Sequence, residues 1–467
     1  MILIPRSFGP AVTKFIIETP RCNIWMDPGM GKTSITLSAF DALWLAGSSK
    51  FPVLVIAPFR VARKVWSDEC AKWDQFSNFQ VSTIVGTPAQ RMKALRRDCP
   101  IYTINFENVP WLVDLCEFHW PFASIICDES TRLKGFRLRH GTKRAAALAK
   151  AAKYTARWVN LTGTPVPNGL IDLWGQQWFI DAGRRLGSSF TKYKERWFVE
   201  NRYAQTIELK PHAQDQIIDL ISDVTVNLNA ADYMDIHDPV LVNIIVDLPH
   251  KARLLYQDME KKMIATVDSG QVLEAKTAAD VSIKCLQIAS GLCYHPESTN
   301  WEDIHDIKIE ALKDLLDELS GAPLLVAYHF KPDCAKILKT IPGARLLKSA
   351  QDEDDWNDGK ILVGVVHPAS VGHGLSLQYG GHHIAFYGHW WNLEDYMQVI
   401  ERIGPVRQLQ AGFDRVVFVY HIISRDTIDE DVMERRQGKK TVQEIIRNRV
   451  KKIKRRNRVG PTPLREE

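Results

Sequence analysis

Short apolar runs alternate with amphipathic stretches along the first part of the chain. The runs at 23–26, 53–57, 101–104, 124–127 and 159–161 are largely apolar from end to end. Strands that are buried on both faces of a parallel sheet have this continuous pattern. Amphipathic stretches such as 33–44 and 61–73 lie between them and predict helices. The alternation is typical of the βαβ units of an open parallel sheet.

The alternation stops in a polar and aromatic segment, for which we expect a helical insertion at about 181–230. It returns with apolar runs at 242–246, 324–327, 361–366, 384–387 and 416–420. We therefore predict an α/β protein with two lobes, each a mainly parallel sheet flanked by helices. The expected domains are an N-terminal lobe at 1–230, a C-terminal lobe at 231–434 and a basic tail at 435–467.

Composition agrees with a globular protein of two or three domains. The chain has 467 residues, of which 45% are hydrophobic and 25% are charged. No apolar run reaches the roughly 18–20 residues of a membrane span, and the N-terminus does not have the pattern of a signal peptide. The eight cysteines form no C-x-x-C pair. We expect reduced, mostly buried thiols and a cytoplasmic protein, in the host cell if a phage encodes it, with no membrane partner.

Charge is unevenly distributed, although the net charge is only +5. Residues 435–458 hold twelve Lys or Arg and a single acid, Glu444, and residues 132–153 hold eight basic residues and no acid. Such clusters attract phosphate backbones and make binding dependent on salt. The same pattern has an alternative interpretation. The basic residues would then form a solvated helix face and a tail that keeps the protein in solution.

A glycine-rich segment follows the first predicted strand and precedes a helical pattern. It reads Gly29-Met30-Gly31-Lys32-Thr33. Glycines let backbone N–H groups face a phosphate, and the helix N-terminus adds partial positive charge. Lys32 can reach the β- and γ-phosphates, and the Thr33 hydroxyl can bind Mg²⁺. The segment therefore predicts a site for a nucleoside triphosphate.

Two further strand ends carry groups that such a site needs. The run at 124–127 leads directly into Asp128-Glu129. Asp128 would hold Mg²⁺, and Glu129 would orient and deprotonate the attacking water. Thr162, Gly163 and Thr164 follow the strand at 159–161 and are suited to couple the nucleotide state to the neighbouring lobe, although Gly-Thr-Pro also favours a plain turn.

Together these segments resemble motifs I, II and III of the superfamily 2 helicases and ATPases. The second lobe resembles the SWI/SNF-type branch of DNA translocases in particular. Trp391-Asn392 before Gln398, the Cys293-Tyr294-His295-Pro296 segment and the motif V-like stretch from Ser370 to Leu377 carry this likeness. The small size resembles the compact versions that bacteriophages encode. The resemblance implies two RecA-like lobes and an ATP-dependent DNA helicase or translocase that uses ATP and Mg²⁺.

The resemblance also assigns roles to individual residues. Catalysis would use Lys32 and Glu129 with Gln398, Arg402 and Arg407, the arginines acting as arginine fingers. The family places its second arginine where this chain has Pro405, and Arg407 would fill that role. The expected ATP-binding residues are Arg6, Phe8, Pro28, Gly29, Met30, Gly31, Lys32, Thr33, Asp128, Gly372 and Gly374.

Two more expectations follow from the family pattern. The family reads adenine with a glutamine near the N-terminus, and this chain has Gly9 at that place. Nucleic acid would be contacted mainly through its phosphates, without sequence specificity. The expected contact residues are Pro58, Arg60, Asn105, His329, Lys331, Ser370 and Val371.

Other functions stay open at this point. The substrate could be single-stranded, duplex or forked DNA, and an RNA helicase is the nearest alternative. A nucleotide-dependent clamp, or a motor subunit that works only with a replication or recombination partner, is a different class. The Trp391-Asn392 and Cys293–Pro296 segments favour DNA over RNA, because they resemble the DNA-translocase branch.

Overall fold

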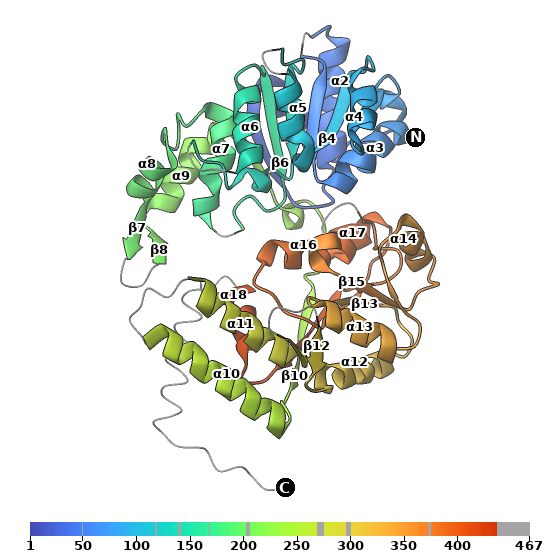
Figure 1. Cartoon of the computed structure of the whole chain (residues 1–467). Helices are drawn as coiled ribbons and strands as arrows, with labels where there is room; N and C mark the ends of the chain where they lie inside the picture. The colour runs from blue at the N-terminus through green and yellow to red at the C-terminus, as the bar shows by residue number, and fades with distance from the viewer. Residues whose placement is uncertain are drawn as a thin grey trace. The chain divides into compact units, whose positions relative to one another are not determined.

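The computed structural model describes residues 1–436, except 49, 117–118, 139–141, 168, 202–205, 269–274, 296–299 and 372–374. The chain forms two compact units (Figure 1). Unit 1 comprises residues 1–200 and 207–236, and unit 2 comprises residues 201–206 and those from His237 onward. The sequence places this boundary at residue 231. Within the described residues, no helix has the length and apolar character that a membrane crossing requires.

Unit 1 is built on a seven-stranded sheet in which all neighbouring strands are parallel. The five apolar runs expected in this half all form strands of the sheet. Two strands, β3 and β9, were not expected from the sequence. In spatial order the strands are β3 (Val81–Ile84), β4 (Ile101–Asn105), β2 (Val53–Ala57), β5 (Ser124–Asp128), β6 (Arg157–Thr162), β1 (Arg21–Met26) and β9 (Thr225–Leu228).

Helices connect these strands (Figure 1), and their apolar side chains pack in clusters with those of the sheet. One large cluster joins Leu54, Ile125 and Trp158 of the sheet to Leu148 and Phe179 of the helices. Burial of such side chains stabilises the unit by about 1.5–3 kcal/mol for each large residue. The helices are α1 (Gly9–Glu18), α2 (Lys32–Leu45), α3 (Trp66–Lys72), α4 (Pro88–Leu95), α5 (Val109–Cys116), α6 (Lys143–Ala152), α7 (Leu173–Asp181), α8 (Phe190–Trp197) and α9 (Ala213–Ile221).

The segment expected as a helical insertion is more than a set of helices. It also holds the strand pair β7 (Phe198–Asn201) and β8 (Thr206–Leu209). Its last strand, β9, pairs in parallel with β1 at the edge of the main sheet. Tyr193 and Ile217 of its helices are fully buried in the main cluster. The segment is therefore part of the core of unit 1, because its apolar side chains complete the cover of the sheet.

Unit 2 contains a six-stranded sheet, again with all neighbouring strands parallel. Successive residues of its central strand enter different clusters, since Leu325 packs with Trp356 and Ile400, and Leu324 packs with Leu312. Helices thus cover both faces, which confirms the predicted α/β class. In spatial order the strands are β10 (Val240–Val246), β17 (Phe418–Ser424), β16 (His383–Phe386), β13 (Leu324–Ala327), β15 (Val363–Val366) and β14 (Ala344–Leu346).

Helices also lie between most of the strands of unit 2 along the chain. A small antiparallel pair, β11 (Leu292–Tyr294) and β12 (Trp301–Asp303), lies outside the main sheet. The helices are α10 (His250–Asp268), α11 (Ala275–Ser290), α12 (Ile307–Glu318), α13 (Lys331–Thr340), α14 (Ala350–Asn357), α15 (Pro368–Val371), α16 (Leu393–Ile403), α17 (Pro405–Gln410) and α18 (Ile428–Arg436).

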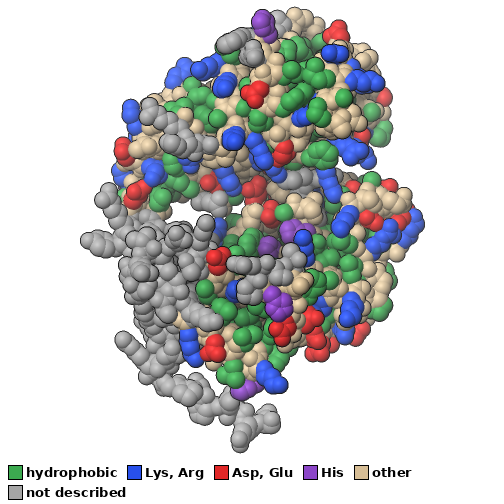
Figure 2. Space-filling view, viewed as in Figure 1, with side chains coloured by type: hydrophobic (Ala, Val, Ile, Leu, Met, Phe, Trp, Pro, Cys, Tyr) green, Lys and Arg blue, Asp and Glu red, His purple; other side chains and the backbone are tan. Residues whose placement is uncertain are grey.

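Charged side chains of both signs gather on the surface of unit 2 around α14 (Figure 2). Arg345 contacts Asp352 at 2.7 Å and Asp355 at 2.9 Å, and Lys360 contacts Asp355 at 3.2 Å. The Ser349 backbone and hydroxyl donors lower the pKa of Asp352, because they stabilise its carboxylate. This acidic helix is thereby neutralised locally by its own neighbours.

The first residues of the expected basic tail, Arg435 and Arg436, lie at the end of α18. Arg436 is the last residue of α18, and its Nη1 donates to Nδ1 of His389 at 3.1 Å. Its guanidinium lies over the Tyr396 ring, 4.1 Å from the centroid. The basic stretch from 437 lies outside the described residues. Arg436 belongs to unit 2, because packing against the aromatic ring and the imidazole holds it in the fold.

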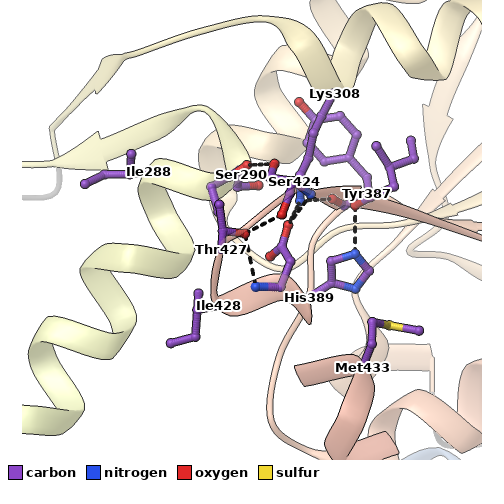
Figure 3. A network of polar contacts seen from close by, with 12 residues as sticks. Ile288, Ser290, Lys308, Tyr387, His389, Ser424, Thr427, Ile428 and Met433 are labelled. Carbon is purple, nitrogen blue, oxygen red and sulfur yellow. Dashed lines mark hydrogen bonds and ion pairs between the residues drawn. The ribbon is translucent and has the colours of Figure 1, made fainter. Parts of the chain in front are cut away.

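A buried polar network joins β17, α12 and α18 in unit 2 (Figure 3). Lys308 Nζ contacts Asp429 Oδ2 at 2.6 Å, and both side chains are only 1% exposed. The same carboxylate accepts the Ser424 backbone N–H at 3.1 Å. The His389 imidazole contacts the Ile422 carbonyl at 2.8 Å, and burial holds its pKa well below the usual range. A buried ion pair of this kind is costly to break from one side, because the remaining charge has no water.

A second carboxylate in this region, that of Asp333, has a raised pKa. Asp333 accepts from the Ser290 hydroxyl at 2.8 Å and from the Phe330 backbone N–H at 2.9 Å. Burial nevertheless raises the pKa of Asp333 to about 6. Lys308 is already paired with Asp429, so it only partly offsets the desolvation of this second carboxylate.

We expect Lys308→Met to lower the free energy of unfolding by about 3–5 kcal/mol, since it leaves Asp429 charged and buried. The double variant Lys308→Met/Asp429→Asn should recover at least half of that loss, because the amide oxygen can still accept from Ser424. Urea unfolding of the full chain measures both values. The exposed Lys339 gives a matched control in Lys339→Met. Equal stability of Lys308→Met and this control would contradict the prediction.

Candidate active site

The parallel pairing of three central strands brings the candidate residues of unit 1 to one edge of the sheet. Asp128 at the end of β5 lies opposite Leu161 of β6, and Thr162 at the end of β6 lies opposite Trp25 of β1. The glycine-rich loop follows β1 directly. Since the carboxyl ends of parallel strands meet at the same edge, the three predicted motifs become neighbours.

The glycine-rich loop has the geometry of an anion site. Gly29 and Gly31 have φ values of 79° and 87°, a region that glycine adopts without a steric penalty. Helix α2 begins at Lys32, and no side chain caps its N-terminus. The first-turn N–H groups of such a helix favour an anion.

Some side chains around the loop can contact a ligand, and others are buried. Lys32 Nζ donates to the carbonyls of Met26 at 2.6 Å and Asp27 at 3.2 Å, so the ammonium lies across the loop. Thr33 is half-buried, whereas Met30 is fully buried and can offer a ligand only its backbone. An ammonium, a hydroxyl and a nearby carboxylate fit a triphosphate with Mg²⁺, a cation that prefers oxygen ligands.

Asp128 is held by an indole that sequence reasoning missed. Trp66, fully buried at the start of α3, donates its Nε1–H to Asp128 Oδ2 at 3.0 Å. Burial raises the pKa of Asp128, while Trp66, the Lys32 charge and the Glu129 backbone N–H oppose that rise. A tryptophan inside an amphipathic helical pattern gives no signal that it will bond to a carboxylate.

Glu129 has a strained backbone. Its φ of 62° and ψ of 58° place it in the left-handed region, which costs a non-glycine residue about 1–2 kcal/mol. Such strain persists where the surrounding structure enforces it, and it gathers at functional sites. Here it reorients the chain directly after β5, so that a 3₁₀ turn (Ser130–Leu133) follows at once.

The predicted coupling loop (residues 162–164) packs directly against the glycine-rich loop (residues 27–31), which we call the phosphate loop. A Cβ on Gly163 would lie 2.8 Å from Pro28 Cδ, so only glycine fits between the two loops. The Thr162 hydroxyl accepts the Thr164 backbone N–H at 3.1 Å and fixes the turn. A shift of either loop would therefore displace the other.

Gln176, for which the sequence predicts no functional role, links motif II to the coupling loop. The Ser130 hydroxyl donates to Gln176 Oε1 at 2.9 Å, and Gln176 Nε2 donates to the Pro165 carbonyl at 2.6 Å. The glutamine is 1% exposed on α7. Adjacent glutamines in an otherwise apolar helix were the available signal, because buried amides need partners.

Gln398, Arg402 and Arg407 lie close in sequence on two helices of unit 2. Asn392 starts α16 by accepting the Glu394 backbone N–H at 3.0 Å, and Pro405 starts α17. Gln398 and Arg402 are buried, and Arg402 Nη1 donates to the Leu375 carbonyl at 3.4 Å.

The second arginine lies within electrostatic reach of the first. Burial and the Arg402 charge lower the pKa of Arg407 to about 9. Within the described part of the chain, Arg407 Nε and Gln398 Oε1 are buried without a hydrogen-bond partner. The short helix α17 thus brings Arg407 near Arg402 despite the proline in the family's usual position.

The residues predicted to contact nucleic acid differ in how exposed they are. Pro58 and Asn105 are buried, and Asn105 donates to Glu107 Oε2 at 2.8 Å. Arg60 is half-buried, and Lys331 and Ser370 are exposed. Val371 ends α15, and Gly372 and Gly374 lie outside the described residues.

His329 has an aromatic environment. Its ring stacks on Trp390 with centroids 4.1 Å apart, and burial lowers its pKa to about 3. The neutral imidazole can stack or accept a hydrogen bond, but it cannot form an ion pair with a phosphate.

The basic run at 132–153 is partly neutralised within unit 1. Arg144 contacts Glu107 at 3.1 Å, Lys134 contacts Asp172 at 3.9 Å, and the Arg137 guanidinium lies 3.3 Å from the Phe190 ring centroid. Basic and acidic side chains are interspersed over the visible face of unit 1 (Figure 2). The described part of this run is therefore a mixed surface.

Comparison with known proteins supplies the family. A family model described as the SNF2-related domain matches residues 22–298, more than half of the chain and including the phosphate loop, Asp128 and Thr162. The chain belongs to the SNF2-related family. This confirms the resemblance to the SWI/SNF-type branch, and it makes the chain an SNF2-related ATPase domain.

Relatives of this SNF2-related chain differ widely in size. Protein p41 of Acyrthosiphon pisum secondary endosymbiont phage 1 is 48% identical over 96% of this chain and 99% of that protein. The DNA repair and recombination protein RAD54-like of Gallus gallus is 21% identical, and the match covers 94% of this chain but only 66% of that protein. A solved Sulfolobus solfataricus SWI2/SNF2 ATPase core in complex with dsDNA is 20% identical, with 98% of both chains covered and a TM-score of 0.43.

We expect Trp66→Phe in this SNF2-related chain to move the acidic limb of the kcat/KM–pH profile for ATP upward by about one pH unit. The indole N–H stabilises ionised Asp128, so its loss raises an already raised pKa. Activity that requires the carboxylate is present above this pKa and is lost as pH falls through it. Trp73 also donates to a carboxylate, Glu69, so Trp73→Phe is the control. An unshifted limb in Trp66→Phe would contradict the role of the indole.

We expect Gln176→Leu to reduce the kcat for ATP hydrolysis about tenfold while leaving the KM for ATP within twofold. The apolar side chain cannot join Ser130 to Pro165, a loss of about 1–3 kcal/mol in bonding. Gln177→Leu is the matched control, because Gln177 is equally buried but contacts Asn23 and Asp181. A comparable loss of kcat in both variants would show that Gln176 acts only through packing.

Proposed function

We propose that this SNF2-related chain is a DNA-dependent ATPase that couples ATP hydrolysis to movement along DNA or to its unwinding. The observation that carries the proposal is the meeting of the glycine-rich loop, Asp128, Glu129 and the coupling loop at one sheet edge. A nucleotide-driven motor needs a bound triphosphate, a catalytic carboxylate and a loop that responds to both.

Each group has a defined task in this proposal. The loop N–H groups and Lys32 hold the phosphates, and Thr33 and Asp128 hold Mg²⁺. The cation, when bound, neutralises charge on the phosphate oxygens. Glu129 orients the attacking water and takes its proton.

Unit 2 supplies the remaining groups that the proposal needs. Gln398, Arg402 and Arg407 stabilise the charge that develops during phosphoryl transfer. The Arg402 and Arg407 guanidinium groups suit this task, because an arginine binds phosphate oxygens with several fixed donors.

DNA is favoured over RNA for two reasons. The Trp391-Asn392 and Cys293–Pro296 segments resemble the DNA-translocase branch. The RAD54-like relative is named as a DNA repair and recombination protein. Exposed Lys331 and Ser370 suit contacts with phosphates, which are not specific for sequence.

We expect Glu129→Gln to lower kcat for ATP by about 10²–10⁴-fold while ATP binding stays within threefold of wild type. The amide keeps the shape of the carboxylate but cannot take a proton. Phosphate release measures hydrolysis, and displacement of a fluorescent ATP analogue measures binding. Glu18→Gln, an exposed change at the end of α1, is the matched control. Wild-type turnover in Glu129→Gln would overturn the catalytic assignment.

The stimulation of ATP hydrolysis by different nucleic acids distinguishes a DNA motor from the alternative functions. Hydrolysis is measured alone and with single-stranded DNA, duplex DNA, forked DNA or RNA. Stimulation by DNA above RNA is expected, and the most effective form identifies the track. Stronger stimulation by RNA would point to an RNA helicase. No stimulation by any polynucleotide would point to a clamp or a motor that needs a partner protein.

A further inference from the structure

Strand β10 (Val240–Val246) forms one edge of the unit 2 sheet. Within the described residues, β17 is its only neighbour in that sheet. β10 has seven residues without charge or proline, whereas the edge strands β3, β9 and β14 have four, four and three residues. Proteins usually prevent an edge from pairing with another chain by making it short or by placing charge or proline on it. β10 has none of these protections.

The backbone groups of β10 alternate between β17 and the open edge. The Val240 N–H donates to the Val417 carbonyl at 2.9 Å, and the Val246 carbonyl accepts from the Arg425 N–H at 2.8 Å. In a parallel pair, alternate residues of a strand bond to the same neighbour. The even-numbered residues of β10 therefore bond to β17. The N–H and C=O groups that face the open edge belong to the odd-numbered residues, Leu241, Asn243 and Ile245.

The side chains of these three odd-numbered residues are exposed as well. Leu241 is 60% exposed and Ile245 is 42% exposed, and Asn243 lies between them on the same face. The alternate side chains of Ile244 and Val246 pack against an apolar cluster of unit 2. One face of β10 is thus anchored in the fold, whereas the other presents two apolar side chains on either side of an amide. A row of this kind on an open edge is suited to pairing with another strand.

The sequence of β10 is nearly symmetric about its central residue, Asn243. It reads Val-Leu-Val-Asn-Ile-Ile-Val, so an aliphatic residue stands at every mirrored position. A two-fold axis at Asn243 would place Leu241 opposite Ile245 of the partner subunit. Because these residues carry the edge-facing N–H and C=O groups, each opposed pair would exchange two backbone hydrogen bonds, as in an antiparallel ladder. The backbone and the side chains therefore specify the same register.

The two ends of β10 differ in charge. Asp238 precedes the strand, and Asp414 lies at the same end, where it contacts His237 at 3.9 Å. At the other end, Arg253 donates to the carbonyls of Arg425 at 2.7 Å and of Asp426 at 3.2 Å. Since a carbonyl is uncharged, these bonds leave the positive charge of Arg253 available to an acid. Antiparallel pairing brings the acidic end of one copy beside this arginine of the other.

We infer that β10 is a docking surface for β10 of a second copy of this chain, paired antiparallel about a two-fold axis at Asn243. Such a contact uses the same surface on both copies, as in most homodimers. It continues the sheet of one copy into that of the other and buries Leu241 against Ile245 of the partner subunit. The two Asn243 amides can hydrogen-bond across the axis. A surface limited to one strand and its flanks is small, so the dimer forms at micromolar concentrations.

Sedimentation velocity of the full chain between about 1 and 100 µM tests the association. The expected result is a monomer–dimer equilibrium with a Kd of about 10 µM. Ile245→Lys should raise this Kd at least about tenfold, because a charge blocks an edge. Leu362→Lys, at an exposed leucine before β15, is the matched control. A monomer at every concentration, or an unchanged Kd in Ile245→Lys, would overturn the inference.

A charge exchange tests the register. Leu241→Lys/Ile245→Lys places like charges opposite each other across the axis and should abolish association up to about 100 µM. Leu241→Lys/Ile245→Glu places each introduced lysine opposite a glutamate and should return the Kd to within about threefold of wild type. Both positions are exposed, so the melting temperatures should match that of the wild type. Equal association of the two double variants would contradict the proposed pairing.

Cysteine cross-linking locates the axis. A residue on the axis meets its own copy with Cα atoms about 5.5 Å apart, within the range of a disulfide. Under mild oxidation, Asn243→Cys should form a disulfide-linked dimer about tenfold faster than Leu241→Cys, which would face Ile245 of the partner subunit. Wild type gives the background from the native cysteines. Cross-linking of Leu241→Cys at the same rate or faster would exclude an axis at Asn243.

Discussion

The parallel register of β5, β6 and β1 is the constraint on which the candidate site depends. Each of these strands ends in a segment that carries chemistry, and the register places the three ends at one edge of the sheet. Gly163 shows how close this approach is, because a Cβ there would overlap Pro28. The glycine-rich loop, the strained Glu129 and the coupling loop therefore form one packed assembly rather than three independent motifs.

Buried polar networks hold this assembly in a defined arrangement. In unit 1, Gln176 connects Ser130 to Pro165, and in unit 2, Lys308 and Asp429 anchor α12 to α18. A buried polar group is stable only with its partners, so each network allows few alternative positions. Elements held in this way move as units. This property suits a protein in which nucleotide binding would be converted into movement.

The phosphate loop satisfies its own cation in the structure. Lys32 donates to two carbonyls of the loop, and a phosphate would have to exchange for one or both. Phosphate binding would therefore replace contacts that Lys32 already makes.

The sequence by itself determined the α/β class, ten of the strands and the phosphate loop, because each depends on residues that are neighbours in the chain. A five-residue apolar run or a Gly-x-Gly-Lys-Thr segment carries its own signal. Only the tertiary structure showed that β9 joins the main sheet, that Trp66 and Gln176 hold motif II, and that Tyr233 lies beside Phe8. These contacts join residues far apart in the chain. No local pattern encodes them, because the partners meet only when the sheet and its helices pack.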